Sequence, residues 1–168
     1  MSRSKKPMPA TSVNSFLDDV LVRAIAEARK KRMRVYTFAF YHDHESAAVS
    51  VCIDTKANSA ARVAAQNAFS MKYFADAVQS GDLAEVAMWR SNPGRNLALG
   101  DFALVNAARS DLNGLRANKG FYLEMIRAVR AREAEIASLA DKDGDLVFCC
   151  SGAKAEVAYV WARQEGAD

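Results

Sequence analysis

The first hydrophobic positions along the chain repeat with a helical period. From Val13 to Ala28 apolar residues recur every three or four positions and form one stripe, and Ser12 or Ser15 can cap its start. This pattern predicts a helix over residues 13–31. Residues 1–11 contain two prolines and no periodic apolar pattern, so we expect a flexible tail there.

A change to strand-like patterns follows directly. Residues 35–41 and 48–53 are rich in β-branched and aromatic side chains, and the polar residues 42–46 separate them. This arrangement predicts an antiparallel β-hairpin whose connecting loop is solvated. Because both strands carry apolar side chains on both sides, we expect helices to pack against the sheet that they form.

Further helices and strands are predicted along the rest of the chain. The predicted helices run from Asn58 to a stop at 79–82, over 101–112 and over 119–140, and the predicted strands cover 83–89 and 146–150. The first of these helices has an alanine-rich face that we expect to lie on the sheet. Residues 155–163 fit a helix and a strand about equally, and we favour a helix. The fold class is therefore α+β, a mainly antiparallel sheet of four or more strands with helices packed against it.

Composition indicates one soluble domain of ordinary size. The chain has 168 residues, of which 51% are apolar and 26% charged, so residues 12–168 can form a single core. No apolar run is long enough for a membrane span, and no secretory signal opens the chain, which favours the cytoplasm. The three cysteines lie in strand-like segments, and we expect Cys149 and Cys150 on opposite faces of one strand rather than in disulfides.

The small net charge of +3 conceals an uneven distribution. Residues 1–34 carry nine basic and three acidic side chains, and residues 35–168 carry fourteen basic and seventeen acidic ones. The basic cluster at 29–34 ends the first predicted helix, where cations complement the helix dipole. We favour this explanation over a protein or nucleic-acid contact, since no nucleic-acid-binding motif accompanies the cluster.

Residues of metal-ligand type gather only in the predicted hairpin loop. His42 and His44 are two positions apart, so they could point the same way and share a metal ion. A metal site needs further ligands, and the chain contains no other histidine, which favours a solvated loop. Cys52 lies within an apolar strand where burial disfavours the thiolate, so it is a poor nucleophile. We expect no catalytic residue and no cofactor.

Trp89, Arg90 and Arg95 form the best candidate for a partner-binding patch. Tryptophan and arginine are enriched at the energetic centres of protein interfaces. The same residues also fit a buried tryptophan beside two solvated arginines, which is the commoner arrangement.

Several segments, taken in order, resemble a bacterial family known as domain of unknown function 4303. The similar segments are the amphipathic start, 35–41, Trp89-Arg90, 102–106, 120–122 and 146–148, and the resemblance spans residues 13–165. It implies a small protein encoded beside a polymorphic or contact-delivered toxin. On this basis we expect a non-enzymatic immunity protein whose partner is the cognate toxin, with a small enzyme or ligand-binding domain as the alternative.

Overall fold

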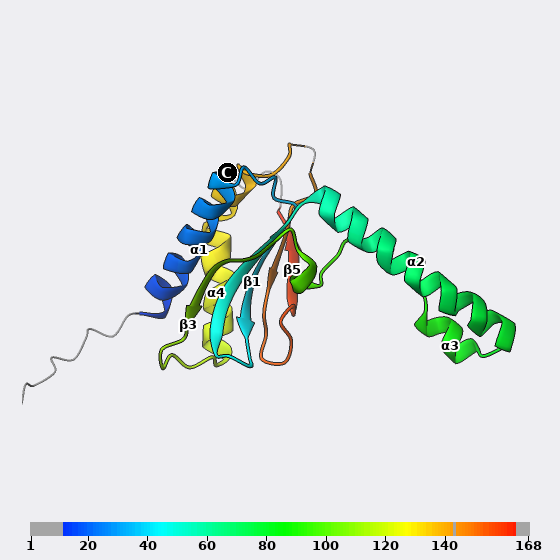
Figure 1. Cartoon of the computed structure of the whole chain (residues 1–168). Coiled ribbons are helices and arrows are strands. Elements are labelled where there is room, and N and C mark those ends of the chain that lie inside the picture. Colours follow the sequence, from blue (N-terminus) through cyan, green and yellow to red (C-terminus); the bar gives the residue numbers. More distant parts are fainter. Residues whose placement is uncertain (1–11, 143, 164–168) are drawn as a thin grey trace, which may run out of the picture.

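The computed structural model describes residues 12–142 and 144–163. Its centre is a five-stranded sheet in the order β3-β2-β1-β4-β5 (Figure 1). The strands are β1 (Thr37–Asp43), β2 (Ala48–Asp54), β3 (Leu104–Asp111), β4 (Val147–Cys150) and β5 (Tyr159–Ala162). Neighbouring strands are antiparallel except for β1 and β4, which run parallel. The predicted α+β class and the predicted hairpin are confirmed, whereas the tail predicted for 1–11 lies outside the described residues.

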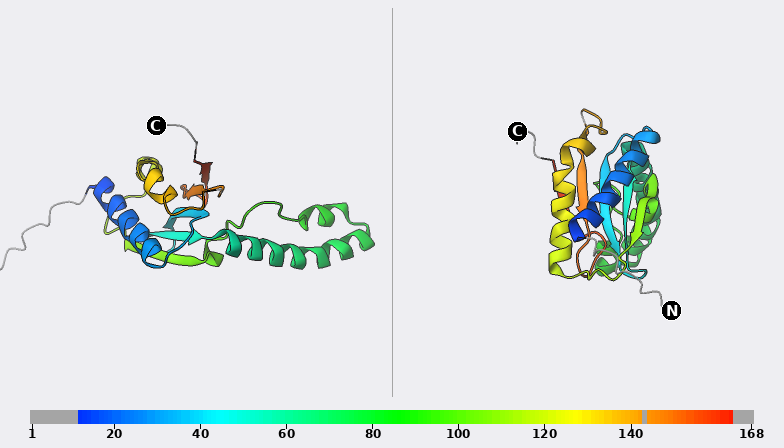
Figure 2. Two further views of the ribbon diagram at one scale, coloured as in Figure 1. Left: turned by 90° about the horizontal axis from the view of Figure 1, so that it is seen from above. Right: turned by 90° about the vertical axis from the view of Figure 1, so that its left-hand side faces the viewer.

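One face of the sheet is covered by helices, as Figure 2 shows from two sides. Helix α1 (Val13–Lys30) and helix α4 (Lys119–Ala131), which is followed by the short α5 (Glu133–Ala137), lie against this face. The Ser12 hydroxyl caps α1 by accepting a hydrogen bond from the Ser15 backbone N–H. The fully buried side chains between the helices and the sheet include Leu17, Leu21, Phe38, Phe40, Met125 and Phe148.

The opposite face of the sheet is covered by a loop instead of a helix. Leu99, in a short 3-10 turn (Leu99–Asp101), and the neighbouring Phe102 pack on Ala39, Cys52 and Cys149. Cys149 contributes to this second cluster and Cys150 to the main core, which confirms their expected placement on opposite faces. Both layers of packing therefore meet at the central strands.

Two helices leave the sheet as a projecting arm. Helix α2 (Lys56–Ser80) begins at the Thr55 cap and extends away from the sheet, and α3 (Leu83–Met88) folds back beside it (Figure 1). Gly81 adopts φ 74° at the end of α2, a left-handed conformation that glycine tolerates. The prediction that the alanines of this helix lie on the sheet was wrong, because almost all of α2 is outside the sheet's footprint.

Four other predicted elements were also wrong. The strand predicted over 83–89 is instead α3, residues 83–88, because Asp82 caps the segment and its Leu, Ala, Glu and Met residues favour a helix. Residues 104–111 form a strand rather than a helix, since they pair with β2 around a local bulge. Residues 159–162 likewise form a strand that pairs with β4, and the long helix predicted over 119–140 is interrupted at Arg132.

Arg132 lies at the break between α4 and α5 and contacts residues of two helices. Its guanidinium donates to both carboxylate oxygens of Asp18 on α1, at 2.8 and 2.9 Å, and to Glu135 at 2.8 Å. Trp161 on the edge strand β5 donates to Glu133 at 2.8 Å. These bonds fix the end of α4 against both α1 and the sheet.

The main core should depend strongly on Phe148. This residue is fully buried and stacks on Trp161 with ring centroids 5.6 Å apart. We expect Phe148→Ala to lower the free energy of unfolding by about 3–5 kcal/mol in urea titrations, because it removes apolar contacts and leaves a cavity. The control Leu83→Ala, at a position 81% exposed on α3, should change it by less than about 0.5 kcal/mol. Similar losses for both variants would contradict this location of the core.

Candidate functional site

The two histidines belong to one polar cluster, in which His42 is buried and His44 is exposed. His42 and Asp43 are part of β1, so the loop predicted over 42–46 was wrong for these two residues, whereas His44 lies in the turn and is exposed, as predicted. His42 is 7% exposed, and its Nδ1 lies 2.9 Å from the Tyr122 hydroxyl of α4. His44 Nε2 lies 3.1 Å from the carbonyl oxygen of Gly152, and the two imidazole ring centroids are 4.6 Å apart. The cluster therefore connects the hairpin to α4 and to the chain after β4.

The partners of these rings are a phenol and a backbone carbonyl, not further metal ligands. Within residues 12–142 and 144–163, no group of three or more His, Cys, Asp or Glu side chains is arranged to hold a metal ion. Burial lowers the pKa of His42, and the neighbouring His44 adds to this effect, while Asp43 opposes it. A neutral His42 hydrogen-bonded to Tyr122 acts as a structural connection within the core.

Charged and polar groups fix the hairpin turn. Arg109 on β3 donates to the Asp43 carboxylate at 2.9 Å, and Ser46 donates to the same carboxylate. The hydrogen bonds from Ser46 and Arg109 hold the pKa of Asp43 well below its usual range. Asp43 also accepts hydrogen bonds from the backbone N–H groups of Glu45 and Ser46. These hydrogen bonds close the turn around the Asp43 carboxylate.

The cysteines are all buried. Burial raises the pKa of the Cys52 and Cys149 thiols to about 11 and raises that of Cys150 further. Thiols in this state are protonated at neutral pH and are inaccessible to a substrate, as expected for Cys52 from its strand pattern.

Of the three residues of the predicted partner-binding patch, Arg95 makes its contacts with the segments beside the sheet, and Trp89 and Arg90 lie at the end of the arm's return. The Arg95 guanidinium lies 3.9 Å from the centre of the Tyr36 ring and donates to the carbonyl oxygens of Tyr36 and Asp145, at 2.8 and 2.6 Å. Arg95 therefore clamps the segments that lead into β1 and β4. Arg90 is exposed at the end of the arm's return, beside Trp89.

Trp89 belongs to an aromatic cluster on the arm. Its ring stacks on Tyr73 with centroids 4.6 Å apart, and Phe69 lies 5.0 Å from Tyr73 and 6.2 Å from Trp89. Phe69 is 53% exposed and Tyr73 41% exposed, so the cluster reaches solvent. The sequence signalled Trp89 but gave no indication of its two aromatic neighbours, because they come from a different helix.

Polar contacts hold the inner side of the arm. Asn67 and the backbone of Asn92 exchange two hydrogen bonds, of 2.7 and 3.0 Å, and Ser59 accepts one from the Asn96 backbone N–H. The buried residues of α2 are only Ser59, Ser70 and Ala77. The inner side of α2 therefore has small residues at its fully buried positions, with Val63, Asn67 and Phe74 partly buried beside them.

The outer side of α2 is exposed. Its apolar residues occur at helical spacing, and Lys72 and Gln79 lie along their edge. We call this set the outer apolar face: Ala57, Ala60, Ala61, Ala64, Ala68, Met71, Ala75 and Val78. Helices that are apolar on their outward side normally pack against another element, and within the described residues no element covers this face. The outer apolar face is the strongest candidate site on the molecule.

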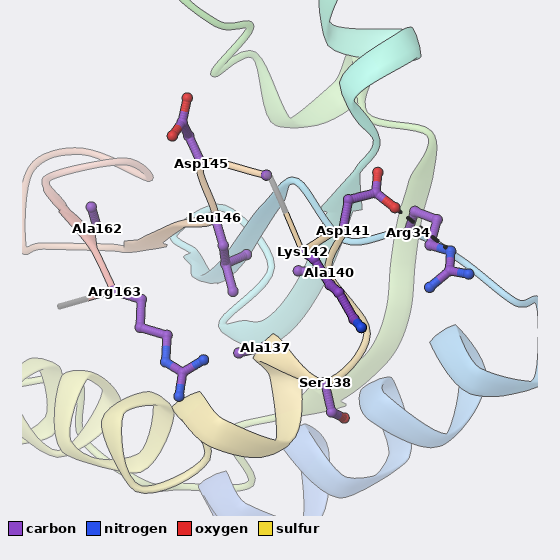
Figure 3. Close-up of a pocket in the computed structure, with 11 residues that line it drawn as sticks. Arg34, Ala137, Ser138, Ala140, Asp141, Lys142, Asp145, Leu146, Ala162 and Arg163 are labelled. Atoms are coloured by element: carbon purple, nitrogen blue, oxygen red, sulfur yellow. Dashed lines mark ion pairs between the residues drawn. The ribbon is translucent and has the colours of Figure 1, made fainter. Parts of the chain in front are cut away.

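A cavity of about 930 Å³ lies beside α5, at the end of the sheet from which the arm leaves (Figure 3). It is open to solvent and lined partly by Arg34, Lys142, Arg163, Asp141 and Asp145. Arg34 pairs with Asp141 at 3.7 Å, with both side chains more than half exposed. Ligand sites are usually more apolar and have convergent buried polar groups, so the cavity is a weaker candidate binding site than the arm.

The basic residues at the end of α1 are partly neutralised by neighbouring carboxylates. Arg29 pairs with Glu135 at 2.9 Å, and Lys31 pairs with Glu27 at 3.5 Å. Arg29 and Lys30 occupy the last turn of α1, where the helix dipole favours cations. This placement agrees with the expected role of the cluster at the helix end.

Comparisons with family models, with curated proteins and with solved structures found no match to this chain. Among the described residues, no helix combines the length and the apolar content that crossing a membrane requires.

The buried His42 should make the stability of the protein depend on pH. The unfolded chain binds a proton at this histidine near pH 6.5, whereas the folded protein binds it only at lower pH. Protonation therefore favours the unfolded state, and stability should fall as the pH drops below about 6.5. In urea titrations, His42→Gln should lose less stability than the wild type between about pH 7.5 and about pH 5.5. An equal loss in both proteins would show that His42 is not the group responsible.

Proposed function

We propose that this chain is a non-enzymatic protein-binding protein that engages its partner through the outer apolar face of α2. The observation that carries the proposal is how little of the apolar surface of this helix is buried. Its buried positions are Ser59, Ser70 and Ala77, whereas Met71 and Val78 are 48% and 55% exposed. Exposed apolar surface of this extent is typical of a surface that another protein covers.

The shape of the arm favours a helical partner segment. The alanines on the outer apolar face let another helix approach closely, and Met71 and Val78 supply larger side chains to fill its grooves. The apolar residues of this face match a partner segment that is itself apolar. Arg62, Lys72 and Asp76 lie on the neighbouring side of α2, where charges influence association rates more than affinity.

The resemblance to the domain of unknown function 4303 family suggests which partner this is. A toxin encoded beside this chain's gene would be held by the arm, and its active surface would be blocked by the bulk of the bound protein. The buried thiols, and the buried His42 held by Tyr122, support a role without catalysis.

The test is to co-express the chain with the product of each adjacent reading frame. We expect one product to stop bacterial growth, the chain to restore growth, and the two proteins to purify as a complex. The double variant Ala64→Glu/Met71→Glu should weaken this complex at least about 100-fold, because binding would then bury two unpaired charges. Affinity can be measured by calorimetry.

The matched control is Ala131→Glu, which also adds a charge at an exposed helical alanine, but on α4. It should bind like the wild type. A complex that tolerates the double variant would place the contact elsewhere on the molecule, and the lack of any toxic or binding neighbour would refute the immunity function.

A further inference from the structure

We propose that two copies of this chain associate through their α2 helices, which lie antiparallel about a two-fold axis at Phe69. The contact uses a different side of α2 from the outer apolar face. Arg62, Phe69 and Asp76 occur at intervals of seven residues and therefore follow one line along the helix. All three are exposed, and Phe69 is the exposed member of the aromatic cluster with the largest open fraction, 53%.

This line is complementary to itself. In an antiparallel pair centred on Phe69, residue 62 of one copy lies level with residue 76 of the other, because the two positions are equally far from residue 69. Each Arg62 then faces Asp76 of the second copy, and the symmetry makes two such ion pairs. A parallel pair would instead place Arg62 against Arg62 and Asp76 against Asp76.

The residues between these charges fit the same arrangement. Ala65 and Gln66 lie on one side of Phe69 along the helix, and Lys72 and Tyr73 lie on the other. In the antiparallel pair, Ala65 and Gln66 of one copy, which have the shorter side chains, lie level with Lys72 and Tyr73 of the second copy. The two surfaces can therefore interdigitate, as packed helices require.

Both charged groups are available for this contact. Within the part of the chain that the structure describes, neither Arg62 nor Asp76 forms an ion pair. The stacked Trp89 and Tyr73 rings lie next to Phe69 and hold its ring in place at the centre of this line. Aromatic residues at the centre and charges toward the ends reproduce the usual order of an interface.

The size and position of the arm also suit a dimer. Its 25 residues make α2 about 37 Å long. A strip of that length and about 12 Å wide on each copy amounts to roughly 900 Å² in total, near the lower limit of about 1,000 Å² for a specific interface. Because the arm projects from the sheet (Figures 1 and 2), antiparallel pairing places the two sheets at opposite ends. We therefore expect a reversible dimer.

Sedimentation velocity over a concentration series tests the proposal. The mass of one chain is 18.3 kDa, and we expect the wild type to approach twice that mass as its concentration rises. The single variants Arg62→Glu and Asp76→Arg should each weaken association at least about 10-fold, because each creates two like-charged contacts. The double variant Arg62→Glu/Asp76→Arg should restore it. Residues 62 and 76 are too far apart on one helix to pair within a chain.

A wild type that stays monomeric into the millimolar range would overturn the proposal, and so would a dimer that tolerates both single reversals. Folding of each variant is checked by circular dichroism, and both positions are exposed, so the fold should persist. The outer apolar face is unchanged in these variants. Binding of a different protein through that face can therefore succeed or fail independently of dimer formation.

Oxidative cross-linking gives a second measurement. The double variant Ala65→Cys/Lys72→Cys should form covalent dimers, because these positions of the two copies lie side by side in the antiparallel pair. The matched control Ala61→Cys/Ala68→Cys has the same spacing on the outer apolar face and should cross-link far less. The native cysteines are buried and contribute little background. Equal cross-linking of both variants would contradict the proposed register.

Discussion

Burial of the central strand β1 on both of its faces is the constraint on which the rest of the structure depends. Phe38 and Phe40 point into the helical layer, while Ala39 and Tyr41 point into the loop-covered layer. A strand in this position must have neighbours on both edges, since unpaired backbone groups in a dry interior are costly. β2 supplies one edge through the hairpin, and β4 supplies the other through a parallel pairing that needs the long connection between them.

That requirement explains where the polar contacts of the body lie. The His42–Tyr122 contact joins the end of β1 to α4, and Arg95 fastens the segments leading into β1 and β4. Arg132 joins the end of α4 to α1. Each of these groups would be a reasonable candidate for chemistry if it lay in an open cleft. Their partners within the fold give them a structural role instead.

The arm is stabilised by much less apolar burial than the sheet and the helices packed on it. Its helix α2 has small residues at its fully buried positions and presents alanine, methionine, valine and phenylalanine outward. A long helix with so little apolar burial gains little stability from its own tertiary contacts. Coverage by other protein surfaces would supply what the arm lacks. The outer apolar face suits a partner segment of apolar character, and the side with Arg62 and Asp76 suits a second copy of the chain.

The sequence by itself determined the local features that depend on neighbours along the chain. The helix at 13–31 and the hairpin at 35–53 were predictable, because their apolar periods and polar breaks are strong and their contacts are local or adjacent. The alternation of Cys149 and Cys150 between faces follows from strand geometry alone. Wherever pairing or burial came from distant segments, the pattern was ambiguous.

Only the tertiary structure decided the remaining features. Residues 104–111 form a strand because they pair with β2, which is distant in sequence, and residues 159–162 form one because they pair with the preceding strand β4. In both cases the pairing overrides a weak helical pattern. Trp89 meets Phe69 and Tyr73 only because Gly81 turns α3 back along α2. The alanines of α2 have the spacing of a face that packs in a core. Helical spacing does not show whether the surface that covers this face belongs to the same chain or to another. That distinction depends on where the helix leaves the sheet, and this is a property of the folded structure.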